Sequence, residues 1–176
     1  MASDDDTGSE RTLGEGRFLR LVRRGKWEFV ERTNVKGVVG IVATTDDGKL
    51  VLVEQWREPV RKWCIELPAG LVGDEDASEE TEASAARELE EETGYRAGWM
   101  EHLCDGVSSA GLSGETIALY RAGGLVRIGE GGGTSNEQIQ VHTVPFAKVQ
   151  GFLESQVMAG KAVDLKAWMA VWLMSR

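Results

Sequence analysis

The sequence predicts an α/β protein: an α/β/α sandwich on a mixed sheet, with an added antiparallel pair of strands near the N-terminus. The chain has 176 residues, of which 41% are hydrophobic, enough for one core. Apolar runs of strand length recur along it, and three segments have helical spacing. No repeat or domain boundary is evident. We therefore expect a disordered acidic tail over residues 1–14 and a single domain over residues 15–176.

The first half of the chain is expected to be mostly strands, at residues 17–24, 26–33, 38–45, 49–56 and 63–70. Gly25 joins the first two. The turn Asp46-Asp47-Gly48 makes the third and fourth a hairpin through the centre of the protein. Pro68 and Gly70 end the fifth strand.

An acidic helix follows these strands. It is expected to begin near Asp76 or Ser78, because Asp76 with Glu79 three residues later makes a plausible capping box. Gly94 lies just past the last periodic residue and is a natural left-handed stop.

The second half is expected to add strands and two more helices. The strands are 98–104, 116–123 and 138–144, with a glycine-rich loop at 129–133. Residues 146–158 have apolar positions at helical spacing, and Asp164 can cap a last helix that runs through Trp168 and Trp172. Those tryptophans are more typical of core or dimer packing than of a cofactor site.

The composition argues against several kinds of partner. The net charge of −9 disfavours nucleic-acid binding, which needs clusters of Lys and Arg. The N-terminus has no apolar signal region, and the apolar C-terminal stretch is too short to span a bilayer, so no membrane partner is expected and the location is expected to be cytoplasmic. The only cysteines, Cys64 and Cys104, form no CxxC motif, and Cys64 is expected to be buried.

The acidic helix concentrates carboxylates on one face. Glu88 and Glu92 are four residues apart and lie one above the other, while Glu91 falls to one side of that line. A glutamate-rich run is usually a solvated helix face. Here, however, Arg87 is the only basic residue in the segment, so the acids are not balanced by alternating lysines. Like charges at this spacing cost a few tenths of a kcal/mol per pair, and a cation would turn that cost into a binding site.

The segment resembles the Nudix box, G-x5-E-x7-R-E-U-x-E-E-x-G-U, where U is apolar or aromatic. Every position is filled, by Gly73, Glu79, Arg87, Glu88, Leu89, Glu91, Glu92, Gly94 and Tyr95. The chain is therefore identified as a member of the Nudix hydrolases, whose fold is the α/β/α sandwich expected above. The resemblance implies hydrolysis of a nucleoside diphosphate linked to another group.

The resemblance also implies roles for the box residues. Glu88 and Glu92 would be direct ligands of Mg²⁺, for which Mn²⁺ can substitute, and Glu91 a ligand or close to one. Arg87 would support catalysis by holding a box glutamate in place, for example Glu91 at i+4. Glu79 would be a structural partner or a peripheral metal contact.

Two segments outside the box, VEQWREP (53–59) and ELPAGLV (66–72), resemble the ADP-ribose pyrophosphatase branch. By that resemblance Arg57 would contact substrate phosphate or ribose, although it could also be an exposed arginine at a strand end. The carbonyl of Ala69 would reach the metal. In that branch the glycine of P-A-G is usually the first glycine of the box, whereas Gly70 here is three residues too early and Gly73 completes the spacing.

A second acid is expected on a loop downstream. Residues 108–116 (SSAGLSGET) resemble the family's loop, which makes Glu115 the candidate general base or additional ligand, or otherwise a solvated turn residue. Glu137 is the second candidate and is also assigned to substrate binding. Trp27 and Arg32 are candidates for the base and sugar pockets, where such side chains often act across a dimer interface, although either could be core or interface instead.

The resulting expectation is a homodimeric, Mg²⁺-dependent pyrophosphatase of ADP-ribose or a related nucleoside diphosphate sugar, a small-molecule substrate. One alternative is a Nudix enzyme for GDP-mannose or dinucleoside polyphosphates. Another is a non-catalytic nucleotide-binding module, which the retention of every box glutamate disfavours.

Overall fold

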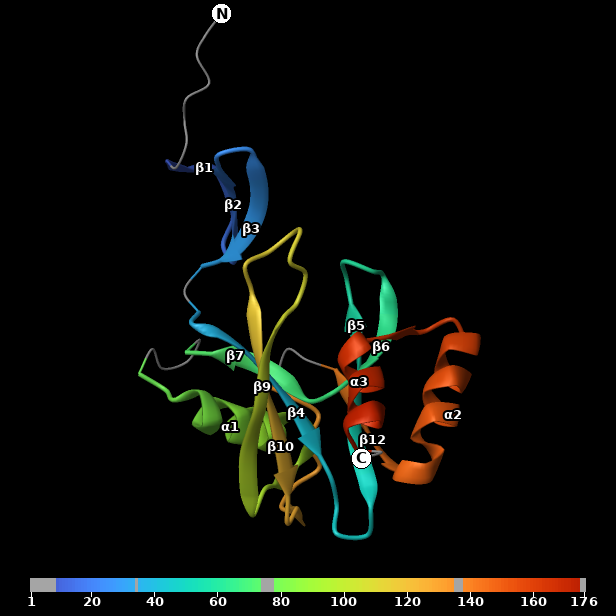
Figure 1. Cartoon of the computed structure of the whole chain (residues 1–176). Coiled ribbons are helices and arrows are strands. Elements are labelled where there is room, and N and C mark those ends of the chain that lie inside the picture. The colour runs from blue at the N-terminus through green and yellow to red at the C-terminus, as the bar shows by residue number, and fades with distance from the viewer. Residues whose placement is uncertain (1–8, 34, 74–77, 135–137, 175–176) are drawn as a thin grey trace, which may run out of the picture.

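The computed structural model describes residues 9–33, 35–73, 78–134 and 138–174 (Figure 1). An N-terminal sheet has the order β1-β2-β3, from β1 (Glu10–Glu15), β2 (Leu19–Arg24) and β3 (Trp27–Arg32). A second sheet has the order β7-β4-β10-β9, from β4 (Gly37–Ala43), β7 (Ala69–Val72), β9 (Trp99–Val107) and β10 (Thr116–Gly123). A third has the order β12-β5-β6-β13, from β5 (Lys49–Arg57), β6 (Lys62–Glu66), β12 (Ile139–Pro145) and β13 (Ala162–Val163).

In the described residues, three helices cover the second and third sheets, namely α1 (Thr81–Thr93), α2 (Phe146–Met158) and α3 (Leu165–Met174). A short pair of strands, β8 (Tyr95–Arg96) and β11 (Val126–Arg127), lies after α1. The second and third sheets each contain one parallel pair, β10 with β4 and β13 with β6, so the predicted mixed character is confirmed. No helix in the described residues is long and apolar enough to cross a membrane.

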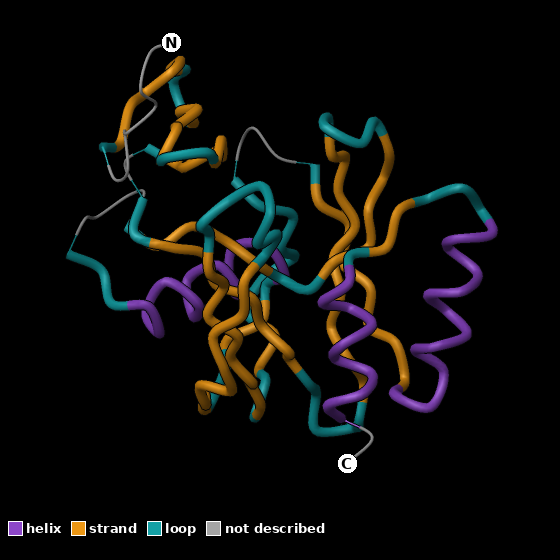
Figure 2. The backbone as a smooth tube through the Cα atoms, turned by 45° about the horizontal axis from the view of Figure 1, so that its top comes forward, coloured by secondary structure: helices purple, strands orange, loops and turns teal. Residues whose placement is uncertain are grey.

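Strands β4 and β5 are sandwiched between two hydrophobic cores. On β5, Leu50 and Leu52 belong to the core packed with α2 and α3, whereas Val51 belongs to the core under α1. On β4, Val42 faces the first core and Ile41 the second. Successive strand residues point to opposite faces, so both strands are buried on both sides. The layers are therefore helix, strands, helices, and the predicted α/β/α sandwich is confirmed (Figures 1 and 2).

The prediction that residues 38–45 and 49–56 pair as a hairpin was wrong, because the two strands lie in different sheets. The turn exists, with the Thr45 amide donating to the Lys49 carbonyl at 2.9 Å, but only an isolated bridge between Thr44 and Leu50 joins the two strands. The edges of β4 are taken by β7 and β10, and those of β5 by β6 and β12. The strands therefore part into different sheets as soon as the turn ends.

The expected strand at 63–70 is two strands in two sheets. β6 ends at Glu66 and β7 begins at Ala69, with Leu67 and Pro68 crossing between them. Proline cannot donate to a sheet ladder, which suits the crossing point. The Pro68 carbonyl accepts from the Ile41 amide at 2.8 Å, and this bond brings the chain onto β4. The segment that precedes α1 therefore starts between the two larger sheets.

Two expected boundaries need correction. Strand β1 covers Glu10–Glu15, so residues 10–14 are not a disordered tail; its backbone is paired with β2. Helix α1 begins at Thr81 rather than near Asp76 or Ser78, with Glu80 as N-cap and no side-chain cap; Asp76 lies outside the described residues. The carboxylate of Glu79 binds the side chains of Ser84 and Arg87.

Several other expectations are confirmed. Helix α2 has the predicted bounds, and Asp164 caps α3 by accepting from the Lys166 amide at 2.6 Å. Gly94 ends α1 with a φ of 72°, a left-handed conformation that suits glycine. Cys64 is buried, and burial raises the pKa of its thiol to about 12.

Candidate active site

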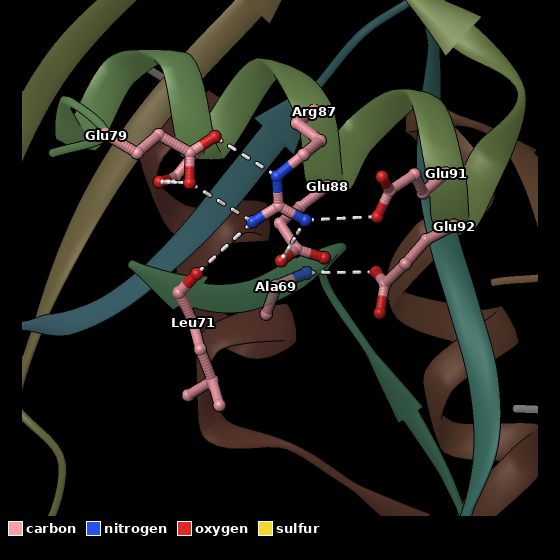
Figure 3. Close-up of polar contacts among 8 residues, drawn as sticks. Ala69, Leu71, Glu79, Arg87, Glu88, Glu91 and Glu92 are labelled. Atoms are coloured by element: carbon pink, nitrogen blue, oxygen red, sulfur yellow. Dashed lines mark hydrogen bonds and ion pairs between the residues drawn. The ribbon is translucent and has the colours of Figure 1, made fainter. Parts of the chain in front are cut away.

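Arg87 is the centre of the polar contacts around α1 (Figure 3). Its Nε donates to Glu79 Oε1 at 3.1 Å, and its Nη1 lies 3.0 Å from Glu88 Oε1 and 3.1 Å from Glu91 Oε2. Its Nη2 donates to the Leu71 carbonyl at 3.4 Å, which ties the helix to β7. The predicted pairing of Arg87 with Glu91 is present, as one of several contacts.

The electrostatics of Arg87 follow from these neighbours. Burial alone would lower its pKa, because the side chain is only 19% exposed and burial disfavours the charged form. The hydrogen bond to Glu79 and the charges of Glu88, Glu79 and Glu91 outweigh burial and raise the pKa. The guanidinium therefore stays charged and partly neutralises three carboxylates. Glu79 also accepts from the Ser84 hydroxyl at 2.6 Å, so its contacts are those of a structural partner.

Glu88 lies against the backbone of β7. A Cβ built on Gly70 would be 1.9 Å from Cδ of Glu88 and 2.2 Å from its Oε1. The helix can bring this carboxylate so close to the strand only because residue 70 has no side chain. Gly70, which precedes the box, therefore makes room for a box glutamate, while Gly73 starts the box with a φ of 79°.

Glu92 is held by the same strand. Its Oε2 accepts from the Ala69 amide at 3.0 Å, and the residue is 4% exposed. The group of Ala69 in contact with Glu92 is thus the N–H, whereas the sequence analysis assigned a metal contact to its carbonyl. Glu88 and Glu92 both face β7, as their spacing of four residues predicts.

Arg57 lies at the end of β5 with its guanidinium fixed by Glu66. Nε and Nη2 donate to the two carboxylate oxygens of Glu66, each at 2.7 Å, which is a bidentate pair. This hydrogen-bonded pairing raises the pKa of Arg57, and the charge of Glu92 contributes to the rise. Arg57 therefore presents a fixed positive charge near the carboxylates of α1, rather than being a free arginine at a strand end.

Glu115 lies in a different setting, between the β9–β10 loop and the N-terminal sheet. Its carboxylate accepts a hydrogen bond from Nε of Arg32 on β3. The loop is joined to the same strand, because the Val30 amide donates to the Leu112 carbonyl at 2.8 Å. Figures 1 and 2 show this loop beside the N-terminal sheet. A pocket of about 230 Å³ opens here, and its lining includes Arg32, Glu115 and Lys36.

The remaining candidates are more scattered. Trp27 is 66% exposed on β3, so it is not a core residue. Glu137 lies outside the described residues. The structure thus groups Glu88, Glu91, Glu92, Arg87, Ala69 and Arg57 around α1 and β7, and groups Arg32 with Glu115.

The donor set around α1 suits a divalent cation. Hard cations such as Mg²⁺ prefer carboxylate and carbonyl oxygens. Glu88 and Glu91 already share one cationic group, Nη1 of Arg87, at 3.0 and 3.1 Å. Within the described residues, no three His, Cys, Asp or Glu side chains are arranged as ready ligands around one point. A metal would therefore require the carboxylates to turn from their present partners.

Sequence reasoning missed two contributors. Glu66, which is almost fully buried and fixes Arg57, could have been suspected as a lone acid in an apolar strand. The glycines at 131–133 do lie in a loop, but the binding of the Gly132 and Gly133 amides to the end of α1 was not predicted. Their unusual density in the sequence was the available signal.

The fold and the site define an α/β/α sandwich with a carboxylate-bearing helix held against a strand by one partly buried arginine. The model of the NUDIX domain matches residues 35–171. The chain belongs to this family. Its hydrolases generally need a divalent metal ion, usually Mg²⁺.

Individual relatives agree with this assignment. The chain is 39% identical over 128 residues to the methanol dehydrogenase activator of Bacillus methanolicus, covering 69% of this chain and 68% of that protein. It is 38% identical over 136 residues to the ADP-ribose pyrophosphatase of Mycobacterium tuberculosis, covering 73% and 65%. The chain thus spans about two thirds of each relative's length. A crystal structure of an ADP compounds hydrolase has a TM-score of 0.72, with 21% identity over 95% of this chain and 92% of that chain, a likeness of fold.

Proposed function

We propose that this protein hydrolyses the pyrophosphate bond of ADP-ribose or a related nucleoside diphosphate sugar, giving a nucleoside monophosphate and a sugar phosphate. The observation that carries the proposal is the arrangement of Glu88 and Glu92 against β7, with Arg57 fixed nearby by Glu66. Carboxylates for a metal and a fixed cation for phosphate are the two requirements of a diphosphate site. The named activity of the mycobacterial relative supports the choice of substrate.

Glu88 and Glu92 would hold Mg²⁺, with Glu91 and the Ala69 carbonyl as further oxygen ligands. When bound, the metal neutralises phosphate charge and lowers the pKa of a coordinated water. The contribution of the protein is then mainly positioning, as phosphoryl transfer demands. Arg87 keeps the carboxylates of Glu88 and Glu91 oriented, and it does so without contacting substrate.

Arg57 would bind the diphosphate. Its bidentate pair with Glu66 uses Nε and Nη2, which leaves Nη1 to donate to a phosphate oxygen. Glu115 would accept the proton of the attacking water as general base. In the structure it is bound to Arg32, so it must leave that contact or work beside it. Trp27, Arg32 and Glu137 belong to the proposed base and sugar pocket.

A homodimer and a cytoplasmic location complete the proposal. The N-terminal sheet exposes several large apolar side chains, namely Phe18, Leu19, Leu21 and Trp27. Leu19 and Leu21 point to one face of this sheet and Trp27 to the other. Exposed large apolar side chains on such a small sheet support the proposal of a protein interface. Light scattering coupled to gel filtration tests the dimer, and a mass of one chain would overturn it.

The activity is tested by incubating the protein and Mg²⁺ with a panel of nucleotides: ADP-ribose, other nucleoside diphosphate sugars, GDP-mannose and dinucleoside polyphosphates. Chromatography of the products should show AMP and ribose phosphate from ADP-ribose. ADP-ribose left intact while another nucleotide is consumed would overturn the choice of substrate. If the whole panel stays intact, the enzymatic proposal fails.

A further inference from the structure

The C-terminal end of α1 receives hydrogen bonds from a distant loop. The last carbonyls of a helix have no partner inside the helix and must find one elsewhere. Gly94 continues the chain and donates to the Glu90 carbonyl at 2.8 Å. The next two carbonyls, of Glu91 and Glu92, accept from the amides of Gly133 and Gly132 at 3.0 and 2.9 Å. These two residues carry candidate metal-binding carboxylates.

The loop reaches the helix only because it lacks side chains there. A Cβ on Gly131 would be 2.4 Å from the Thr93 carbonyl carbon and 2.7 Å from the Glu92 carbonyl oxygen, and Gly131 has a φ of 71°. Both contacts are with main-chain atoms, which cannot rotate away as a side chain can. From the other side, a Cβ on Gly94 would be 2.3 Å from the Gly129 carbonyl oxygen. The two backbones are therefore in direct contact.

We propose that Gly131, Gly132 and Gly133 form a glycine clamp that sets the position of the last turn of α1, and with it the carboxylates of Glu91 and Glu92. The clamp residues are positioning residues, since they act through the helix. The clamp fixes the main chain of this turn at its carbonyl end, while Arg87 and the Ala69 amide fix the carboxylates of Glu91 and Glu92. The inference rests on the proposed function, because it takes the carboxylates of Glu91 and Glu92 to be ligands of the metal.

The test compares three alanine variants of one loop. Gly131→Ala adds a methyl group where main-chain atoms lie, so the loop or the helix end must shift. Gly132→Ala also strains the backbone, since Gly132 has a φ of 110°. It is the milder change, because its Cβ would meet only the Ile139 carbonyl oxygen, at 3.8 Å. Gly129→Ala is the matched control, since its Cβ would meet nothing within 4 Å. The affinity of each full-length protein for Mn²⁺ is measured by electron paramagnetic resonance without nucleotide, together with turnover and thermal unfolding.

We expect Gly131→Ala to weaken Mn²⁺ binding by about tenfold or more, the effect seen when groups that orient metal ligands are lost. Gly132→Ala should weaken it less, and Gly129→Ala should leave it unchanged. A purely structural role would lower the unfolding temperature and leave Mn²⁺ affinity at 25 °C unaltered. If Gly131→Ala does not fold, Gly132→Ala decides the question.

Wild-type Mn²⁺ affinity in the folded clamp variants, or an equal loss in Gly129→Ala, would overturn the clamp. A wild-type protein that binds Mn²⁺ but cleaves no nucleotide would overturn the proposed activity, while the ranking of the variants would still decide the clamp. A wild-type protein that does not bind Mn²⁺ would overturn both.

Discussion

Arg87 and Arg32 each hold a candidate functional carboxylate, but in different ways. Arg87 is 19% exposed and contacts Glu79, Glu88, Glu91 and the Leu71 carbonyl. Arg32 is 39% exposed and pairs with Glu115 at the edge of an open pocket. Solvent therefore screens the pair of Arg32 more strongly than the contacts of Arg87.

The difference separates a fixed part of the site from an adjustable one. Removing one partner of a buried charge network leaves uncompensated charges and is costly, whereas an exposed pair contributes little. The carboxylates of α1 are therefore held in one arrangement by the protein itself, and a metal ion must draw them away from Arg87 or the Ala69 amide. Glu115 can leave Arg32 at a small cost in free energy. A general base that contacts the substrate only during the reaction needs this freedom.

The largest effect is expected for Glu92→Gln. Glutamine keeps the size of the side chain and can still accept from the Ala69 amide, so the fold should be retained, but a charged oxygen of the fixed part is lost. Turnover should fall about a thousandfold, roughly 4 kcal/mol in barrier height. Glu90→Gln is the control, because Glu90 lies on the same helix as Glu92 but pairs with the exposed Arg96 of β8. Near wild-type turnover in folded Glu92→Gln would remove Glu92 from the site.

Arg87→Met should be the most damaging change to stability. It leaves the carboxylates of Glu79, Glu88 and Glu91 close together without their shared cation. The free energy of unfolding should fall by about 3 kcal/mol in a urea titration. Arg96→Met, which breaks an exposed pair with Glu90, should cost under about 1 kcal/mol. Equal losses in the two variants would contradict the contrast between buried and exposed pairs.

Glu115→Gln tests the adjustable part. Loss of a general base should lower turnover about a hundredfold, while stability stays the same. Glu101→Gln, on the exposed strand β9, serves as control. Near wild-type turnover in folded Glu115→Gln would exclude Glu115 as the base and direct the same test to Glu137.

Arg32→Ala should have only a small effect on stability. The pair with Glu115 is partly solvated, so its loss should change the free energy of unfolding by under about 1 kcal/mol, and by less at high ionic strength. Urea titrations at low and high salt measure this. A loss as large as that of Arg87→Met would mean that the loop is held as firmly as the helix.

Local spacing predicted the fixed part of the site and missed most of what surrounds it. The box placed Glu88, Glu91 and Glu92 on one helix face, and the i+4 rule paired Arg87 with Glu91. The contact between Glu88 and Gly70 depends on how closely α1 approaches β7, which no helical period specifies. The pairing of Arg32 with Glu115 joins residues 83 positions apart, for which spacing gives no rule.

For the fold, the positions of the strands were predicted but their pairing was not. Strand-length apolar runs located β4 and β5, but their hydrophobicity could not say that each is buried between two cores and paired with other strands. A tight turn between two such runs favours a hairpin. Here the pairing with β7 and β10 on one side, and with β6 and β12 on the other, outweighs it. The short strands β8, β11 and β13 give too few residues for a periodic signal.

The contact at Gly70 also makes a practical reagent possible. An alanine there would overlap the side chain of Glu88, since its Cβ would lie 1.9 Å from Cδ and 2.3 Å from Cγ, so the carboxylate would have to move. Gly70→Ala would therefore yield an inert reference protein that retains every ionisable group and the same isoelectric point. Nucleotide capture or crystallisation with an intact substrate could then be attempted on a protein whose overall charge matches that of the natural chain.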